Sequence, residues 1–345
     1  MSMYSEIFEQ PTVLHRLLIE QHSTIIEIAQ KINKRNIDYV LLAARGTSDN
    51  VGRYAGYLWG ARNRLPVALA MPSLFTLYQE PPRLKNSLVV GISQSGQSPD
   101  IVSVLKEGKK QGAATLAITN NESSPLAKTA DYTINILAGE EKAVAATKTY
   151  TAQLLAVAML SCALIEDQKS TNEIDHVADW VEEVLKQDKL IQEKVQRYRY
   201  MERCVVLGRG YNYASAFEWA LKLKELSFIT SEPYSMADFK HGPIAVINKG
   251  FPVMVIAPKG KTFPSTYESV KYIKEVLSAE IITISNDRNL LSISDTQISI
   301  PSNIPEWLSP IPAIIAGQLF AYHLTCEKGL DPEKPRTIQK VTETY

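Results

Sequence analysis

Residues 91–100 read GISQSGQSPD, which places small polar side chains directly after an apolar run. The run over residues 88–92 is typical of a fully buried strand. Ser98, Pro99 and Asp100 then supply an N-cap, a first-position proline and a first-turn acid, which together predict a helix start. A turn of this kind directs hydroxyls, backbone N–H groups and the positive end of a helix dipole to one place. It predicts a phosphate or carboxylate site, and an ordinary polar loop is the alternative.

A second chemically active group is Glu218, Lys222 and Glu225, spaced i, i+4 and i+7 on a predicted helix. On a solvent-exposed helix this spacing would give one ion pair worth about 0.2–0.5 kcal/mol. Nearly all other positions of the helix are apolar, however, which favours burial. A charged stripe on a buried helix indicates a pocket in which carboxylates and a cation could act on a ligand.

The elements that must position these groups form a sequence repeat. The strand-like segment ending at Gly46 matches one ending at Gly210, an offset of 210 − 46 = 164 residues. At the same offset, residues 89–92 match residues 253–256, and residues 131–136 match residues 295–300. Expected helices, such as 99–111 and 265–278, alternate with four expected strands in each half. This alternation predicts an α/β fold with two doubly wound parallel sheets flanked by helices, and ligands at the carboxyl ends of the strands.

The two halves differ in the places where chemistry is expected. Residues 93–98 read SQSGQS, whereas the matching residues 257–262 read APKGKT. The helix with the charged stripe lies in the second half, and the matching positions of the first half are uncharged. We therefore predict an anion-binding loop in the first half and the charged groups in the second half.

Composition excludes several classes of function. The 345 residues carry 37 basic and 37 acidic side chains. The chain therefore lacks the positive net charge that would favour binding to nucleic acid or to an anionic membrane surface. The longest nearly unbroken apolar run, residues 154–165, is shorter than the roughly 20 residues of a membrane span. Three distant cysteines indicate a reducing compartment, and five histidines lack metal-ligand spacing. We expect a cytoplasmic protein without a metal or other cofactor.

Six motifs together resemble the double-SIS-domain sugar isomerase family. They are RGTSDN, SQSGQSPD, VAATKTYTAQL, LGRGYNYASAFEWALKLKELSF, FKHGPIAVI and KPRTIQKVTETY, and they extend from about residue 25 to the C-terminus. The family includes the isomerase half of glutamine-fructose-6-phosphate aminotransferase and SIS-type glucosamine-6-phosphate deaminases. The resemblance implies two flavodoxin-like SIS domains, at residues 29–166 and 201–329. An N-terminal helical segment (1–28), a linking helix (167–200) and a tail over the active site (330–345) complete the expected organisation.

The resemblance also implies catalytic residues. Glu225 matches the glutamate that moves a proton between C1 and C2 of an open-chain sugar, and Lys222 matches the lysine that stabilises the enediolate oxygen. His241 matches the histidine that opens the sugar ring and that reaches in from a neighbouring subunit, which implies a homodimer. Lys340 matches the tail lysine that forms a Schiff base with the ketose carbonyl. Lys340 would have to lose its proton, so we expect the tail to be ordered over the pocket.

The partner implied by the resemblance is a hexosamine or hexose 6-phosphate. The residues expected to bind its phosphate and sugar are Thr47, Ser48, Ser93, Gln94, Ser95, Ser98 and Val144.

Departures from the aminotransferase pattern favour the deaminase branch. The sequence given starts Met1-Ser2 and its first cysteine is Cys162, so we expect no N-terminal cysteine nucleophile of a glutaminase. Arg45 and Ala146 replace a cysteine and a serine of the synthases. We therefore expect conversion of glucosamine 6-phosphate to fructose 6-phosphate and ammonia.

Other functions remain open. The same chemistry would serve an aminotransferase/isomerase without a glutaminase, a fructosamine-6-phosphate deglycase or a plain aldose-ketose isomerase. A regulatory sugar-phosphate-binding module belongs to a different class. Such a module would need the anion loop but has no use for Glu225, Lys222 and Lys340 together, which favours an enzyme.

Overall fold

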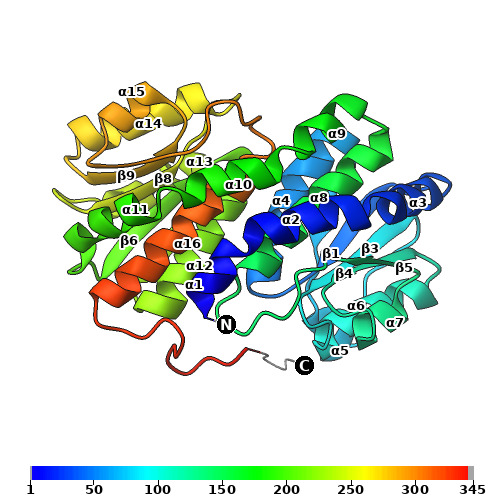
Figure 1. Cartoon of the computed structure of the whole chain (residues 1–345). Coiled ribbons are helices and arrows are strands. Elements are labelled where there is room, and N and C mark those ends of the chain that lie inside the picture. Colours follow the sequence, from blue (N-terminus) through cyan, green and yellow to red (C-terminus); the bar gives the residue numbers. More distant parts are fainter. Residues whose placement is uncertain (1, 341–345) are drawn as a thin grey trace. The chain divides into compact units, whose positions relative to one another are not determined.

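A computed structural model describes residues 2–340, and the chain divides into two compact units that are described separately (Figure 1). Of the described residues, unit 1 comprises 2–11, 142–147 and 176–338. Unit 2 comprises 12–141, 148–175 and 339–340. Each unit contains one five-stranded sheet in which all strand pairs are parallel. The predicted α/β fold with two doubly wound sheets is confirmed.

The sheet of unit 2 has the strand order β2-β1-β3-β4-β5. This is a flavodoxin-like order, in which the chain reverses direction across the sheet between β1 and β3. The strands are β1 (Tyr39–Ala43), β2 (Val67–Leu69), β3 (Ser87–Ser93), β4 (Ala114–Thr119) and β5 (Tyr132–Asn135). Every residue of β3 and β4 is buried, as expected for central parallel strands covered on both faces.

Helices cover both faces of this sheet (Figure 1). On one face α8 (Lys148–Ile165) packs on α3 (His22–Asn33) and α4 (Thr47–Leu58). On the other face α6 (Pro99–Lys110) packs on α5 (Ser73–Thr76) and α7 (Pro125–Thr129) over the apolar side chains of β1, β3 and β4. The remaining helices of unit 2 are most of α2 (Gln10–Glu20), the π-helix Trp59–Asn63 and α9 (Gln168–Ile174).

The boundaries of α6 follow from the sequence around it. Ser98 is the N-cap residue, Pro99 occupies the first turn, and two lysines lie in the last turn. Gly112 follows with φ +77°, and its N–H bonds back to the carbonyl of Lys109, which ends the helix. The helix therefore directs its N-terminus to the carboxyl end of β3, as predicted.

The sheet of unit 1 has the order β10-β9-β8-β6-β7, the same topology read from the other edge. Its strands are β6 (Arg203–Gly208), β7 (Thr230–Ser235), β8 (Pro252–Ile256), β9 (Glu280–Ser285) and β10 (Thr296–Ser299). One face carries α12 (Tyr213–Ser227) and α16 (Pro310–Glu327), which pack on each other. Beyond the other face lie α13 (Met236–Phe239), α14 (Phe263–Glu275) and α15 (Arg288–Ser292), with a short 3-10 helix at Pro243–Val246. A second 3-10 helix, Gly210–Asn212, directly precedes α12 and packs on it.

The segment between the two repeats differs from the single linking helix that the sequence predicts. It contains α9, α10 (Val177–Leu185), α11 (Asp188–Val195) and the 3-10 turn Gln196–Tyr198. Both α10 and α11 pack on α16, as does the N-terminal helix α1 (Met3–Phe8). Packing breaks the helix where the sequence has no Gly or Pro to mark a boundary. The predicted domain bounds remain a prediction.

Candidate active site

The predicted anion loop connects β3 to α6 in unit 2. The side-chain oxygen of Ser93 accepts a hydrogen bond from the N–H of Gly96 (3.1 Å), and that of Ser95 accepts one from the N–H of Gln97 (3.3 Å). Gly96 has φ +64°, and a Cβ there would lie 2.2 Å from the Ser124 hydroxyl oxygen. The Ser98 hydroxyl makes no capping hydrogen bond to α6. The loop is thus a tight, fixed turn that presents hydroxyls beside a helix N-terminus.

A second turn of the same kind connects β1 to α4. Gly46 has φ +53° and is the N-cap of α4, so Thr47 and Ser48 occupy the first turn of that helix. The Ser48 hydroxyl donates to Gln153 Oε1 of α8 (3.2 Å). The Gln153 Nε2 atom is buried and has no hydrogen-bond partner among the described residues. A polar group or water at this turn would satisfy it.

An ion pair joins the two turns. Arg45 Nε lies 2.8 Å from Asp100 Oδ2, and the Asp100 side chain is buried in the first turn of α6. Strands β1 and β3 are neighbours, and α4 and α6 follow them on opposite faces of the sheet. Two helix N-termini therefore meet at the topological switch point, where doubly wound sheets bind ligands. Their dipoles favour an anion there.

The charged stripe of unit 1 lies on α12, and it is buried as predicted. Glu218 and Lys222 are 0% exposed, and Lys222 Nζ lies 3.3 Å from Glu218 Oε1 and 2.6 Å from Glu225 Oε2. Burial alone would lower the pKa of Lys222, but the two carboxylates outweigh it and raise this pKa above its usual range. The Glu225 side chain remains 23% exposed, so this carboxylate can reach solvent or a ligand.

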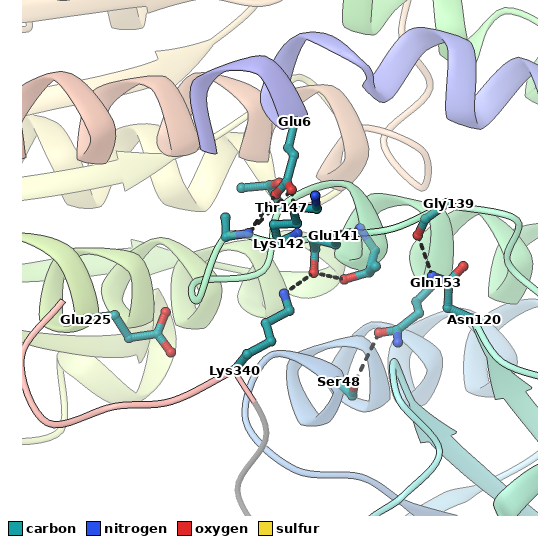
Figure 2. Close-up of polar contacts among 12 residues, drawn as sticks. Glu6, Ser48, Asn120, Gly139, Glu141, Lys142, Thr147, Gln153, Glu225 and Lys340 are labelled. Atoms are coloured by element: carbon teal, nitrogen blue, oxygen red, sulfur yellow. Dashed lines mark hydrogen bonds and ion pairs between the residues drawn. The ribbon is translucent and has the colours of Figure 1, made fainter. Parts of the chain in front are cut away.

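Lys340, in the C-terminal segment assigned to unit 2, is fixed by an ion pair. Its Nζ lies 2.6 Å from Glu141 Oε2, and the Glu141 side chain is 0% exposed (Figure 2). The Lys340 side chain is 24% exposed. Residues 341–345 of the expected tail lie outside the described residues, so the tail's position over a site remains a prediction.

His241 and Val144, the remaining predicted site residues, both lie in unit 1. His241 is exposed in the turn after α13, and its backbone N–H donates to the carbonyl of Asp238. Val144 is half-buried in the 142–147 segment of unit 1. The structure describes the first-repeat residues within unit 2 and Glu225, Lys222, His241 and Val144 within unit 1. Their joint role in one site remains a prediction.

Two residues were missed by the sequence analysis. Glu141 holds Lys340, and buried Glu6 of α1 accepts hydrogen bonds from the N–H groups of Lys142 and Ala143 (Figure 2). Glu6 precedes the region that resembles the family. Glu141 lies in a polar loop and Glu6 in a six-residue helix, and neither position carries a spacing signal that would have identified it.

Comparison with known families decides the family. A family profile of the SIS domain matches residues 32–163 and 199–327, one match in each repeat. The chain belongs to the SIS domain family. The resemblance that the sequence motifs indicated is confirmed.

SIS-domain relatives match almost the whole chain. It is 35% identical to the glutamine–fructose-6-phosphate aminotransferase [isomerizing] of Thermococcus kodakarensis over 347 residues, which covers 98% of this chain and 57% of the relative. This chain thus spans little more than half of that relative's length. The C-terminal domain of glucosamine-fructose-6-phosphate aminotransferase from Francisella tularensis has a TM-score of 0.87 at 28% identity, covering 96% of this chain and 98% of that chain.

A glucosamine-6-phosphate deaminase from Thermotoga maritima shares the SIS fold. Its TM-score is 0.77 at 20% identity, and the match covers 100% of both chains. At this identity the likeness shows the fold alone.

Two further features of the SIS units bear on the sequence predictions. By length and composition α8 could cross a membrane, but 83% of its apolar window is buried within the protein. Among residues 2–340, no group of three His, Cys, Asp or Glu side chains is arranged to hold a metal ion.

Proposed function

We propose that this chain is an amino-sugar-phosphate deaminase that converts glucosamine 6-phosphate to fructose 6-phosphate and ammonia. The observation that carries the proposal is the buried Glu218–Lys222–Glu225 array on α12. Burying charges is costly unless they are paired, and a binding module would have no use for a cation and a partly exposed carboxylate held together in this way. Proton transfer next to a developing oxyanion requires both groups.

The phosphate would bind at the switch point of unit 2. Helices α4 and α6 supply N–H groups and dipoles, and Arg45 adds a cation fixed by Asp100. The hydroxyls and amide proposed to bind the phosphate and sugar belong to Thr47, Ser48, Ser93, Gln94, Ser95 and Ser98. Val144 is proposed as an apolar sugar contact.

The reaction would start with ring opening by His241, contributed by a second copy of the chain. Glu225 would then take the proton from C2 and return it to C1, while the Lys222 ammonium stabilises the negative oxygen. The resulting C2 imine would be hydrolysed to fructose 6-phosphate and ammonia. Lys340 would form a Schiff base with C2 during this exchange.

The relatives support sugar isomerisation, because the printed name of the Thermococcus kodakarensis relative includes an isomerising aminotransferase activity on fructose 6-phosphate. Arg45 and Ala146 stand where the synthases have a cysteine and a serine, and this resemblance to the deaminase branch supports deamination over that relative's reaction. A cytoplasmic homodimer is part of the proposal. A fructosamine-6-phosphate deglycase and an ammonia-dependent aminotransferase are the alternatives within the same chemistry.

One assay separates these functions. Purified protein would be incubated with glucosamine 6-phosphate and with fructosamine 6-phosphates, and ammonia or free amine, fructose 6-phosphate and glucose 6-phosphate would be measured. Ammonia and fructose 6-phosphate from glucosamine 6-phosphate support the deaminase. Amine release only from fructosamine phosphates would replace it with the deglycase. Binding without turnover of any sugar would leave the regulatory module.

A further inference from the structure

Glu141 occupies an unusual environment for an acidic residue. Its carboxylate is buried and receives three hydrogen bonds: from Lys340 Nζ at 2.6 Å, from the Thr149 hydroxyl at 2.9 Å and from the Thr149 N–H at 3.0 Å (Figure 2). Thr149 lies in the first turn of α8, whose dipole favours a negative charge. Buried carboxylates are rare unless they are paired in this way.

The loop that carries Glu141 is fixed on the carboxyl side of the sheet in unit 2. Asn120, directly after β4, accepts a hydrogen bond from the N–H of Ala138 (2.9 Å) and donates one to the carbonyl of Gly139 (2.7 Å). Thr149 fixes the carboxylate itself. Glu141 is therefore preorganised to receive the ammonium of the lysine.

An ammonium paired with a carboxylate cannot attack a carbonyl until it loses a proton. The proposed function requires Lys340 to attack C2, and the group in contact with its Nζ is Glu141. We propose that Glu141 is the proton-transfer partner of Lys340 during Schiff-base formation. This inference rests on the proposed function, because it assigns the proton acceptor for the same lysine.

Schiff-base formation at Lys340 would involve three proton transfers. Glu141 takes one proton from the Lys340 ammonium, and the lone pair released on Nζ forms a bond to C2 of fructose 6-phosphate. A second proton passes from nitrogen to the former carbonyl oxygen, giving a carbinolamine. Glu141 then returns its proton to that hydroxyl, the C–O bond breaks, and water leaves with the bonding pair. The products are the protonated Schiff base, water and the regenerated carboxylate.

If Glu141 only anchored Lys340, the structure would be the same, but the rate of Schiff-base formation would depend on pH in a different way. An anchor only holds the lysine in place, so its loss slows attack by a similar factor at every pH. A proton acceptor is needed most where the lysine is almost fully protonated. Loss of the acceptor is therefore most damaging near neutral pH and is relieved as the pH rises.

The test uses the full chain with fructose 6-phosphate and sodium cyanoborohydride. Reduction converts the Schiff base to a stable adduct, and peptide mass spectrometry measures the rate of labelling at Lys340 between pH 6 and 9. For Glu141→Gln we expect labelling about 10²-fold slower than in the wild type at pH 7, with the deficit shrinking as the pH rises. The adjacent, exposed Glu140 offers a matched control, because Glu140→Gln removes the same charge and should label at the wild-type rate.

Other charged residues on these segments are Lys142 and the buried Lys148, and neither is altered in any of the variants. If Glu141→Gln does not fold, Glu141→Asp replaces it, because its shorter side chain moves the carboxylate away from Lys340 Nζ. A labelling deficit that is largest near neutral pH and shrinks as the pH rises supports the inference for this variant too. Equal labelling of Glu141→Gln and the wild type, or a deficit that is constant with pH, overturns it. If wild-type Lys340 labels no faster than exposed Lys224, the Schiff-base step of the proposed function fails as well.

Discussion

At the scale of single residues, the protonation of Lys222 is tied to the fold. Its pKa is raised above the ordinary 10.5 because Glu218 and Glu225 outweigh the effect of burial. The ion pairs therefore stabilise the fold fully below about pH 10.5, the unfolded-state value, and this stabilisation is lost as the pH rises through the higher folded-state pKa.

Replacing Lys222 by Met should lower the free energy of unfolding by about 3–5 kcal/mol at pH 7, because two carboxylates lose their cation. Urea unfolding from pH 7 to 11 checks this, and the deficit relative to the wild type should shrink above about pH 10.5. Lys224→Met, on the exposed side of the same helix, is the control and should change stability little. A deficit that stays constant up to pH 11 would contradict the linkage.

Glu225 differs from Glu218 in being partly exposed, which is what a proton shuttle needs. Glu225→Gln keeps an oxygen to accept from Lys222 but cannot take a proton. Turnover of glucosamine 6-phosphate should therefore fall by about 10²–10⁴, while its affinity for the sugar phosphate changes little. Steady-state kinetics and calorimetry measure the two quantities, and unchanged turnover would remove Glu225 from the mechanism. Lys224→Gln is the matched surface variant.

At the scale of elements, the turn between β3 and α6 depends on Gly96. A side chain there meets both the positive φ and the buried Ser124 hydroxyl, which accepts a capping hydrogen bond from the N–H of Ala127 in α7. Gly112 also has a positive φ, but its Cβ would meet nothing within 4 Å. Comparing alanine substitutions at Gly96 and Gly112 therefore distinguishes the cost of backbone strain from the cost of a steric clash.

Gly112→Ala should cost about 1–2 kcal/mol of stability from backbone strain alone. Gly96→Ala should cost more, and it should also weaken binding of a hexose 6-phosphate, because the turn must shift to accommodate the methyl group. Urea unfolding and calorimetric titration would measure these effects. If both variants lose the same amount of stability and Gly96→Ala binds hexose 6-phosphate as tightly as the wild type, the turn tolerates the added methyl group.

The matching turn of unit 1 is filled by a side chain of the protein itself, which is a physical reason to expect an anion loop in the first repeat alone. There the Glu306 carboxylate accepts hydrogen bonds from the N–H groups of Lys261 and Thr262 and from the Thr262 hydroxyl, at the N-terminus of α14. A Cβ at Gly260 would lie 2.2 Å from Glu306 Cδ. An internal carboxylate thus satisfies the groups that an external anion would otherwise bind.

Sequence patterns predicted four of the five strands of each sheet, including the edge strands β5 and β10, but missed β2 and β7. Both are edge strands that pair on one side only. β2 has only three residues, and β7 contains Glu232 and Pro233, which suit an edge but break any apolar pattern. The strand-to-helix turn at residues 93–98 was predictable because its N-cap, proline and glycine act locally.

The Glu141–Lys340 pair could not have been predicted from sequence patterns. The two residues are 199 positions apart, and neither lies in a periodic element. Periodicity reports which face of an element is buried, whereas a contact between a loop and a tail depends on the completed fold. The burial of Lys222 was predictable because the apolar residues around it share its helix.

At the scale of the whole molecule, the two units share one topology but carry different polar and charged groups. Unit 2 has two polar turns at its switch point, and unit 1 has a charged helix and an internally satisfied turn. His241 fits neither set, because it is exposed in a single chain and follows a short helix. This exposed position agrees with the proposal that His241 acts in the site of a second subunit.

Mixing two inactive variants tests that role. Co-expressed Glu225→Gln and His241→Ala chains would form mixed dimers in which one site combines Glu225 from one chain with His241 from the other. With random pairing, about one quarter of the wild-type activity should return, since half of the dimers each regain one of two sites. Mixing Glu225→Gln with Lys222→Met is the matched control, because both residues come from the same chain and no site is restored. If the first mixture is as inactive as the second, His241 acts within its own chain or not at all.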